Sequence, residues 1–292
     1  MKLTGTGVAL VTPFKGNGSI DELALRKLVG HQIENGTDFL VVLGTTGESA
    51  TLSQEEQDEV LAIVIDENQK KLPIVLGMGG NNTAELCRKM AAFDNPDVDA
   101  FLSASPHYNK PTQQGIIEHF KALAQVSTRP IILYNVPGRT ASNMTAETTI
   151  ELSQVDNIIA VKEASGNIDQ VMQIIDKSHR DFLVLSGEDA LTMPIVALGG
   201  HGVISVVANA FPNQFSEMIK STLANDLDKA RSLHYQLLDL INLLFAEGNP
   251  AGIKYCLKEL NICKNELRLP LVPISEQLQK RIQEELQTKQ LN

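Results

Sequence analysis

The sequence predicts an α/β protein, a (β/α)8 TIM barrel followed by a C-terminal helical region. The chain has 292 residues. Short apolar runs recur along it about 28 residues apart, close to the roughly 30 residues of a βα unit, and helix-like stretches fill the intervals. Eight such units fit a closed barrel better than an open doubly wound sheet, which usually has fewer strands. We therefore expect strands at residues 8–11, 39–43, 74–76, 100–102, 131–133, 158–161, 182–185 and 203–207.

Helix-start signals stand between these runs. Residues 19–22 and 53–56 both match the capping-box pattern, in which a Ser side chain and a Glu three residues later satisfy the first free N–H groups of a helix. Thr83 and Thr145 open two further helix-like stretches. The first expected helix carries apolar residues at helical spacing, namely Leu23, Leu25, Leu28, Val29 and Ile33.

The pattern changes after the eighth run. From Phe211 onward the sequence is helical in character, and residues 247–250 (Glu-Gly-Asn-Pro) end one of these helices. We divide the chain into a barrel, residues 1–224, and a C-terminal helical region, residues 225–292. The apolar faces of this region are expected to pack either on the barrel or on another subunit, and the pattern leaves both open.

Composition excludes several classes of function. A net charge of −10 argues against nucleic acid or an anionic membrane as the main partner, because both require clustered Lys and Arg. The three cysteines lack the spacing of a zinc site or a disulfide framework, the six histidines are dispersed, and no phosphate-binding or dinucleotide fingerprint is present. No segment has the length of a membrane span. We expect a cytoplasmic protein.

Lys162 is the most informative single residue. It ends the apolar run 158–161, and barrels build their active sites from strand carboxyl ends and the loops that follow. A lysine amine in a partly desolvated site is a nucleophile towards a carbonyl, which is the requirement for Schiff-base chemistry. The alternative is a lysine that caps its strand and points to water, as most strand-end lysines do.

Other strand ends also carry unusual residues. Residues 44–48 (Gly-Thr-Thr-Gly-Glu) offer hydroxyls and amides that suit a small carboxylate, or they form a polar turn. Tyr108 and Tyr134 stand near the ends of the fourth and fifth strands. Each is either a core residue whose hydroxyl finds a partner or, together with a nearby Thr, part of a proton relay. Arg139 lies in a Pro-Gly turn. Its guanidinium either binds a carboxylate through two hydrogen bonds or forms a salt bridge at the surface.

Taken together, these stretches resemble the dihydrodipicolinate synthase family of class I, lysine-dependent pyruvate aldolases. The resemblance runs nearly end to end and implies a (β/α)8 barrel with a helical C-terminal region and no cofactor. It implies condensation of pyruvate, held as a lysine Schiff base and enamine, with L-aspartate 4-semialdehyde in the diaminopimelate route of lysine biosynthesis. It rests on residues 44–49, 108–111, 134–140, 161–164 and 200–205, in this order.

The resemblance also implies roles for the catalytic residues. Lys162 would form the Schiff base with pyruvate, and Tyr134 would donate and accept protons beside it. Thr45 and Tyr108 would complete a hydroxyl relay with Tyr134, because a chain of hydroxyls lets a proton travel between a buried centre and solvent. In this family the second Tyr reaches in from a neighbouring subunit. At least a dimer is therefore expected, and a homotetramer built as a dimer of dimers is common in the family.

Three further residues would bind the substrates. Thr46 would hold the pyruvate carboxylate, Ile204 would lie against the pyruvate adduct, and Arg139 would bind the carboxylate of the semialdehyde. A cation near the mouth would orient an anionic aldehyde despite the negative net charge.

Inhibition by lysine is common in this family, through a site at a subunit interface. Gln54, Gln57 and His107 stand where lysine-sensitive members commonly have His, His and Tyr, so we expect weak or absent inhibition. The residues that match the usual lining are Ser49, Ala50, Asn81 and Glu85.

Two other functions compete with the synthase. A sister aldolase, such as an N-acetylneuraminate lyase or a 2-keto-3-deoxy sugar acid aldolase, shares the lysine and the tyrosine. Arg139 and the doublet Thr45-Thr46 favour the synthase, because a short anionic aldehyde needs a cation at this place. A non-catalytic barrel is the other alternative, and the retention of every relay hydroxyl argues against it.

Overall fold

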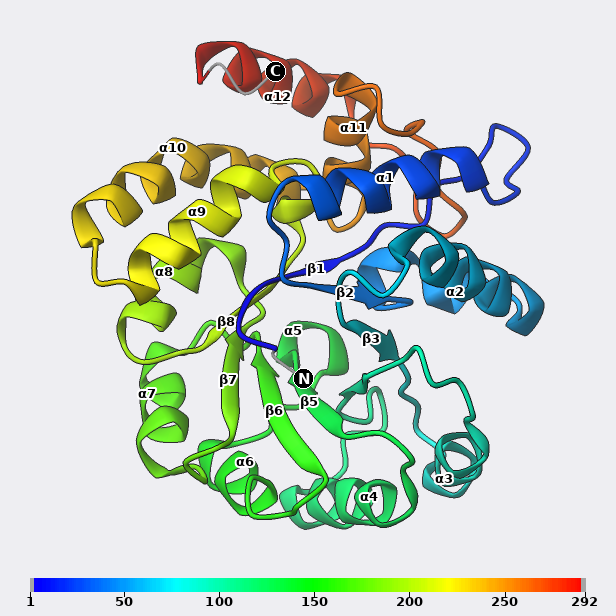
Figure 1. The fold of residues 1–292 in the computed structure, drawn as a ribbon, viewed down its shortest axis with the longest axis vertical. Coiled ribbons are helices and arrows are strands. Elements are labelled where there is room, and N and C mark those ends of the chain that lie inside the picture. Colours follow the sequence, from blue (N-terminus) through cyan, green and yellow to red (C-terminus); the bar gives the residue numbers. More distant parts are fainter. Residues whose placement is uncertain (1–2, 290–292) are drawn as a thin grey trace.

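Eight parallel strands close into a barrel in the computed structural model, which describes residues 3–289. Each strand pairs with its neighbours in chain order, and the eighth pairs with the first (Figure 1). The predicted (β/α)8 fold is confirmed. The strands are β1 (Gly5–Ala9), β2 (Phe39–Val42), β3 (Ile74–Gly77), β4 (Ala100–Ala104), β5 (Ile131–Asn135), β6 (Ile158–Glu163), β7 (Leu183–Ser186) and β8 (Gly202–Ser205).

Two strands differ from their expected limits in an informative way. β1 begins at Gly5, three residues before the first apolar run, because glycines carry the strand where it pairs with β8. A Cβ on Gly202, whose φ is +151°, would lie 2.0 Å from the carbonyl oxygen of Gly5, so only glycine allows the barrel to close there. β6 continues through Lys162 to Glu163, which places the lysine inside the strand and not after it.

The helices surround the barrel (Figure 1). They are α1 (Glu22–Glu34), α2 (Gln54–Asn68), α3 (Thr83–Ala92), α4 (Gln113–Val126), α5 (Pro137–Thr140), α6 (Ala146–Leu152), α7 (Ile168–Lys177), α8 (Thr192–Ala197), α9 (Pro212–Leu223), α10 (Leu227–Phe245), α11 (Ala251–Glu259) and α12 (Glu276–Thr288).

The capping predictions were partly right. Ser53 and Glu56 form the predicted capping box of α2, and Thr145 caps α6. The prediction for residues 19–22 was wrong, because α1 starts at Glu22 and Asp21 is its N-cap. The apolar stripe of α1 was also wrong at Leu23, which is 81% exposed. The buried face of α1 consists of Ala24, Leu25, Leu28, Val29 and Gln32.

The core has two layers. The inner layer fills the barrel with side chains that alternate along the strands, among them Phe39 and Val41 of β2 and Ile132 of β5. The outer layer lies between the strands and the helices and includes Leu25 of α1 and Phe120 of α4. Tyr134 belongs to the inner layer, so the interior packing of the barrel continues up to the residues of its mouth.

The C-terminal helices pack on the barrel of the same chain, which decides between the two arrangements the sequence left open. Leu237, Leu240 and Ile241 of α10 are buried in the outer core layer, as are Ile253 of α11 and Ile282 of α12. Figure 1 shows α10, α11 and α12 gathered at one side of the barrel, near α1 and α9.

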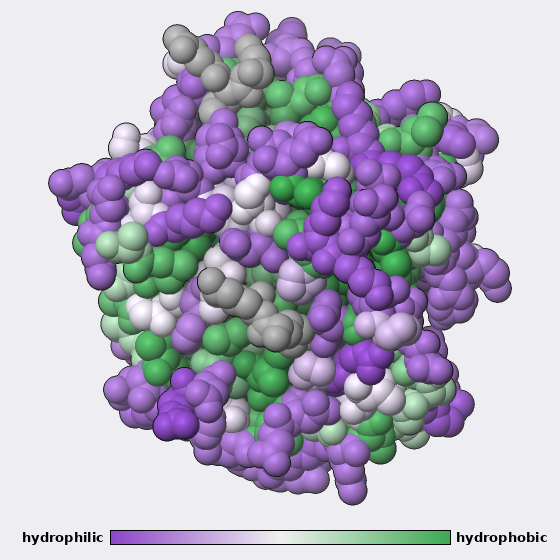
Figure 2. Space-filling view, viewed as in Figure 1, coloured by the Kyte–Doolittle hydropathy of each residue, from purple (hydrophilic) through white to green (hydrophobic). Residues whose placement is uncertain are grey.

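Polar residues cover most of the face seen in Figure 2, and apolar residues show in patches between them. Within residues 3–289, none of the helices combines the length and the hydrophobicity that a membrane-spanning helix needs.

His119 of α4 makes stability depend on pH. The ring is 4% exposed, its Nδ1 lies 2.8 Å from Thr83 Oγ1, and burial lowers its pKa to about 4. The unfolded chain binds a proton near pH 6.5 and the folded chain does not. This stability is therefore present above pH 6.5 and is lost as pH falls towards 4.

Replacing His119 by Asn, which can keep the bond to Thr83, should flatten this dependence. We expect the fall in the free energy of unfolding between pH 7 and pH 4 to shrink by up to about 3 kcal/mol, measured by urea unfolding. The exposed His179, changed to Asn, is the control. Identical pH dependence in wild type and His119→Asn would contradict the assignment.

Candidate active site

A cavity of about 740 Å³ lies at the carboxyl ends of the strands. Its walls include Tyr134 of β5, Lys162 of β6 and the loop after β2 with Thr45 and Thr46. Residues that the sequence places far apart meet here because all the strands are parallel and end at the same face. Thr46, Tyr134 and Lys162 are buried, whereas Thr45 is exposed at the cavity wall.

Lys162 points into the barrel mouth. The strand register sets it beside Tyr134 on one side and Leu185 on the other. Its side chain is buried, with a residue exposure of 5%, and Nζ lies 4.2 Å from the centroid of the Tyr134 ring. A Cβ on Gly187 would lie 3.0 Å from Cγ and Cε of Lys162, so this glycine leaves room for the lysine stem. The amine thus stands against an aromatic face and beside open space.

Glu163 anchors the same strand from its other face. Its carboxyl oxygens accept from Asn135 Nδ2 at 3.0 Å, Gln170 Nε2 at 3.0 Å and the backbone N–H of Ser165 at 2.7 Å. These bonds tie the ends of β5 and β6 to α7. Because side chains alternate along a strand, fixing Glu163 outward keeps Lys162 pointing inward.

Two acidic residues lie near Lys162. Burial, and then the neighbouring Asp189, raise the pKa of Glu188, while Lys162 opposes the shift. Burial likewise raises the pKa of Asp189, whose carboxyl accepts from the backbone N–H groups of Val206 at 3.0 Å and Val207 at 3.1 Å. Asp189 therefore holds the turn after β8, the strand that carries Ile204.

The loop after β2 has an unusual backbone. Leu43 and Glu48 both have positive φ, 59° and 53°, although neither is glycine. Such residues persist only where the surroundings determine them, and they cluster at binding sites. Between them, Thr46 accepts a hydrogen bond at its hydroxyl from Asn249 Nδ2 at 2.9 Å. The loop is thereby joined to the turn between α10 and α11.

The remaining predicted residues occupy different positions. Ile204 is 1% exposed and packs in the inner core layer with Tyr134. Arg139 is exposed on α5, with Nη2 3.5 Å from the carbonyl oxygen of Asn249. Tyr108 is 88% exposed, and its backbone N–H donates to Thr140 O at 3.2 Å. Within one chain, Tyr108 is therefore not part of the cavity wall.

The cavity also extends towards α2 and α3. Gln54, Gln57 and His107 line its wall together with Ser49 and Ala50. Gln57 Nε2 donates to the carbonyl oxygen of Ser49 at 3.2 Å. Asn81 holds the neighbouring loop by accepting from the backbone N–H of His107 at 2.9 Å.

Sequence reasoning missed several residues of this site. Asn249 was interpreted only as part of a helix-ending turn, and its bond to Thr46 spans 203 positions of sequence. Glu188, two residues after the end of β7, is a second residue for which the sequence pattern predicts no role. The Gly-Asn-Pro turn gives no local signal that Asn249 has a distant partner. The sequence does contain a signal for Glu188, because it is an acidic residue close to the carboxyl end of a strand.

Comparison with known proteins gives consistent matches. The model of the Dihydrodipicolinate synthetase family matches residues 2–289. A protein of Flavobacterium psychrophilum named 4-hydroxy-tetrahydrodipicolinate synthase is 50% identical over 289 residues, 99% of this chain and 98% of that protein. The crystal structure of dihydrodipicolinate synthase from Aquifex aeolicus has a TM-score of 0.94 and 41% identity, and the match covers 99% of both chains. A chloride-inhibited dihydrodipicolinate synthase from Acinetobacter baumannii, complexed with pyruvate, has a TM-score of 0.96 and 37% identity over 100% of both chains.

Proposed function

Because the chain belongs to the dihydrodipicolinate synthetase family, we propose how its residues carry out the reaction of that family. The chain is a lyase of the class I aldolase type and functions in 4-hydroxy-tetrahydrodipicolinate synthesis. The observation that supports the proposal most is the buried Lys162 amine, 4.2 Å from the Tyr134 ring centroid at the wall of the cavity. The test is turnover of pyruvate with L-aspartate 4-semialdehyde by the purified chain, with N-acetylneuraminate as the competing substrate.

Lys162 is the nucleophile in this proposal. Its amine, in the unprotonated form, adds to the keto carbon of pyruvate. The carbinolamine that results takes up one proton and loses water, which leaves an iminium. The positive nitrogen acidifies the methyl group, so that removal of one methyl proton gives an enamine. The enamine carbon attacks the aldehyde carbon of the second substrate, whose oxygen takes up a proton. Attack by the amine of the semialdehyde on the carbon of the new iminium would close the ring and release the Lys162 amine.

Tyr134 is the proton carrier beside the nitrogen. Its ring lies against the Lys162 amine, and each step of the sequence above moves one proton. Thr45, at the cavity wall, is the next hydroxyl of the relay that we propose. Thr46 binds the pyruvate carboxylate, and the buried Ile204 supplies the apolar surface against which the adduct lies.

Arg139 is the proposed binding residue for the carboxylate of the semialdehyde. It is exposed, and within residues 3–289 its guanidinium makes one hydrogen bond, the long one of 3.5 Å to Asn249 O, so the guanidinium has donors to offer an anion. Arg139→Met should raise the KM for the semialdehyde by about 10- to 100-fold, with a much smaller effect on the KM for pyruvate.

Steady-state kinetics with each substrate varied in turn measures this difference. Arg180→Met, on an exposed arginine, is the control. A variant of Arg139 with unchanged semialdehyde KM, or with equal rises for both substrates, would contradict the role.

Tyr108 is proposed to act in a neighbouring subunit of a homotetramer built as a dimer of dimers. Its 88% exposure in the single chain supports a role outside its own cavity. The variants Tyr108→Phe and Lys162→Ala should each have little activity alone. When they co-assemble at random, half of the dimers are mixed, and one of the two sites in each mixed dimer combines an intact Lys162 with an intact Tyr108. Roughly a quarter of wild-type activity should therefore return in the whole mixture, and up to about half in the isolated mixed species.

Co-expression with two affinity tags, followed by isolation of the doubly tagged species and assay, provides the measurement. Sedimentation of the same preparation gives the oligomeric state. If the doubly tagged species stays as inactive as its parents, Tyr108 does not act in trans.

The proposal also covers the location of the protein and the division of the chain. The cytoplasm is the location we propose, because Cys87, Cys256 and Cys263 are free thiols, which suit a reducing compartment. We also propose the division into a barrel, residues 1–224, and a C-terminal helical region, residues 225–292, in which the second region supports the site of the first.

A further inference from the structure

A buried ion pair joins the loop after β2 to α11. Glu48 and Lys254 pair through Oε1 and Nζ, and both side chains are 0% exposed. Lys254 Nζ also donates to Glu266 O at 2.8 Å and lies 4.2 Å from the centroid of the Phe14 ring. Desolvation of two charges largely offsets their attraction, so a pair of this kind is weak evidence for a stabilising role. The position of the pair suggests a role other than stabilisation.

Glu48 determines the path of the loop that carries Thr45 and Thr46. Its backbone lies between two short 3-10 turns, Thr45–Gly47 and Ser49–Thr51. Its N–H donates to Thr45 O at 3.1 Å, and its carbonyl oxygen accepts from Thr51 N–H at 2.9 Å. Because Glu48 stands in the left-handed region, with φ of 53°, this path needs a fixed side chain to hold it.

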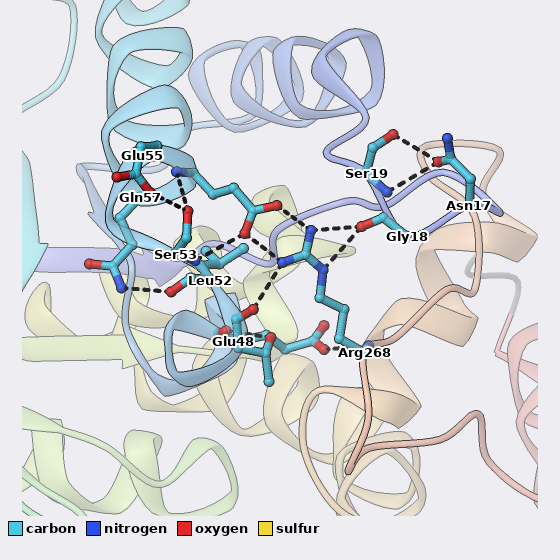
Figure 3. A network of polar contacts seen from close by, with 11 residues as sticks. Asn17, Gly18, Ser19, Glu48, Leu52, Ser53, Glu55, Gln57 and Arg268 are labelled. Carbon is cyan, nitrogen blue, oxygen red and sulfur yellow. Dashed lines mark hydrogen bonds and ion pairs between the residues drawn. The ribbon is translucent and has the colours of Figure 1, made fainter.

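Arg268 holds the same loop from a second direction. Its backbone N–H donates to Glu48 Oε2 at 3.1 Å, and its guanidinium donates to Thr51 O at 2.9 Å. The guanidinium also donates to Gly18 O (Figure 3). It donates as well to the carboxylate of Glu56, in the first turn of α2. The contact with Arg268 lowers the pKa of Glu56 to about 2. Together with the bond from Asn249 to Thr46, the stretch 249–268 contacts the loop at three places.

We propose that Glu48 is a positioning residue for the keto-acid carboxylate: Lys254 and Arg268 hold its side chain, and its backbone in turn fixes the Thr45-Thr46 turn in the cavity wall. This rests on the proposed function, in which Thr46 binds that carboxylate. The C-terminal region is then a working part of the pyruvate site, although none of the three residues lines the cavity.

The double variant Glu48→Met/Lys254→Met separates positioning from stability. Removing both charges leaves no unpaired buried charge, so the melting temperature should stay close to that of the wild type. The loop nevertheless loses its tie to α11. The pyruvate concentration for half-maximal borohydride trapping, and the KM for pyruvate, should rise at least about tenfold, which corresponds to about 1.4 kcal/mol of lost binding. The kcat should fall by less than about threefold.

The matched control is Lys121→Met/Glu151→Met, which removes a pair exposed between α4 and α6. A Glu48→Met/Lys254→Met protein with native melting temperature and native half-saturation would overturn the proposal. Should the double variant not fold, Glu48→Gln/Lys254→Met, which removes the tie to Lys254 and keeps a side-chain oxygen to accept from the Arg268 N–H, decides by the same two readouts. We expect a rise of about threefold in half-saturation, and an unchanged value overturns the proposal. These outcomes can be distinguished from failure of the proposed function. In that case the wild type itself would show no trapping at any pyruvate concentration.

Discussion

Replacing Lys162 with alanine is expected to lower kcat/KM for the condensation by about 10⁴-fold or more. The reason is that covalent attachment is the step on which every later step depends, since no other group activates the methyl carbon of pyruvate as an iminium does. The side chain is buried at the wall of the cavity, so removal of the amine leaves space beside Tyr134.

Lys162→Arg is the informative companion, because it keeps a positive charge at the same strand end but cannot form the Schiff base under these conditions. It should be as inactive as the alanine variant. Lys121→Ala, on an exposed lysine of α4, is the surface control. Activity within tenfold of wild type in either Lys162 variant would mean that this amine is not the nucleophile.

Replacing Tyr134 with phenylalanine is expected to lower kcat by 10²- to 10⁴-fold, the usual contribution of a positioned acid–base group. The phenylalanine ring keeps the aromatic face against the lysine amine and removes only the hydroxyl. Borohydride trapping of pyruvate should therefore still reach Lys162, more slowly, while the condensation nearly stops.

The measurement compares the rate of borohydride trapping with the rate of turnover in Tyr134→Phe and in the wild type. Tyr235→Phe, on an exposed tyrosine of α10, is the control. Equal losses in both rates and in the melting temperature would indicate a packing role for Tyr134, which also belongs to the inner core layer.

The sequence predicts the barrel well because the signal is periodic. Apolar runs at a spacing of about 28 residues mark parallel strands, and parallel strands bring their carboxyl ends to one face. From that alone, Lys162, Tyr134 and the Thr45-Thr46 doublet are expected near each other, and all line one cavity. The cap of α1 shows the limit of local patterns, since Ser19 and Asp21 are both good capping residues and the tertiary structure chooses Asp21.

The support of the site could not be predicted from the sequence. Glu48 meets Lys254 across 206 positions and Arg268 across 220, and no periodicity links such residues. A glutamate after Gly-Thr-Thr-Gly is compatible with a solvent-exposed turn, and a lysine within a helix is usually exposed. The trans position proposed for Tyr108 is likewise a property of the assembly, which a single chain does not contain.

The measurement that tests this account most directly is reduction with borohydride in the presence of pyruvate, followed by peptide mass spectrometry. We expect one pyruvate-derived adduct per chain, on Lys162, and no adduct when pyruvate or borohydride is omitted. An adduct on a different lysine, or turnover of pyruvate with no adduct at all, would contradict it.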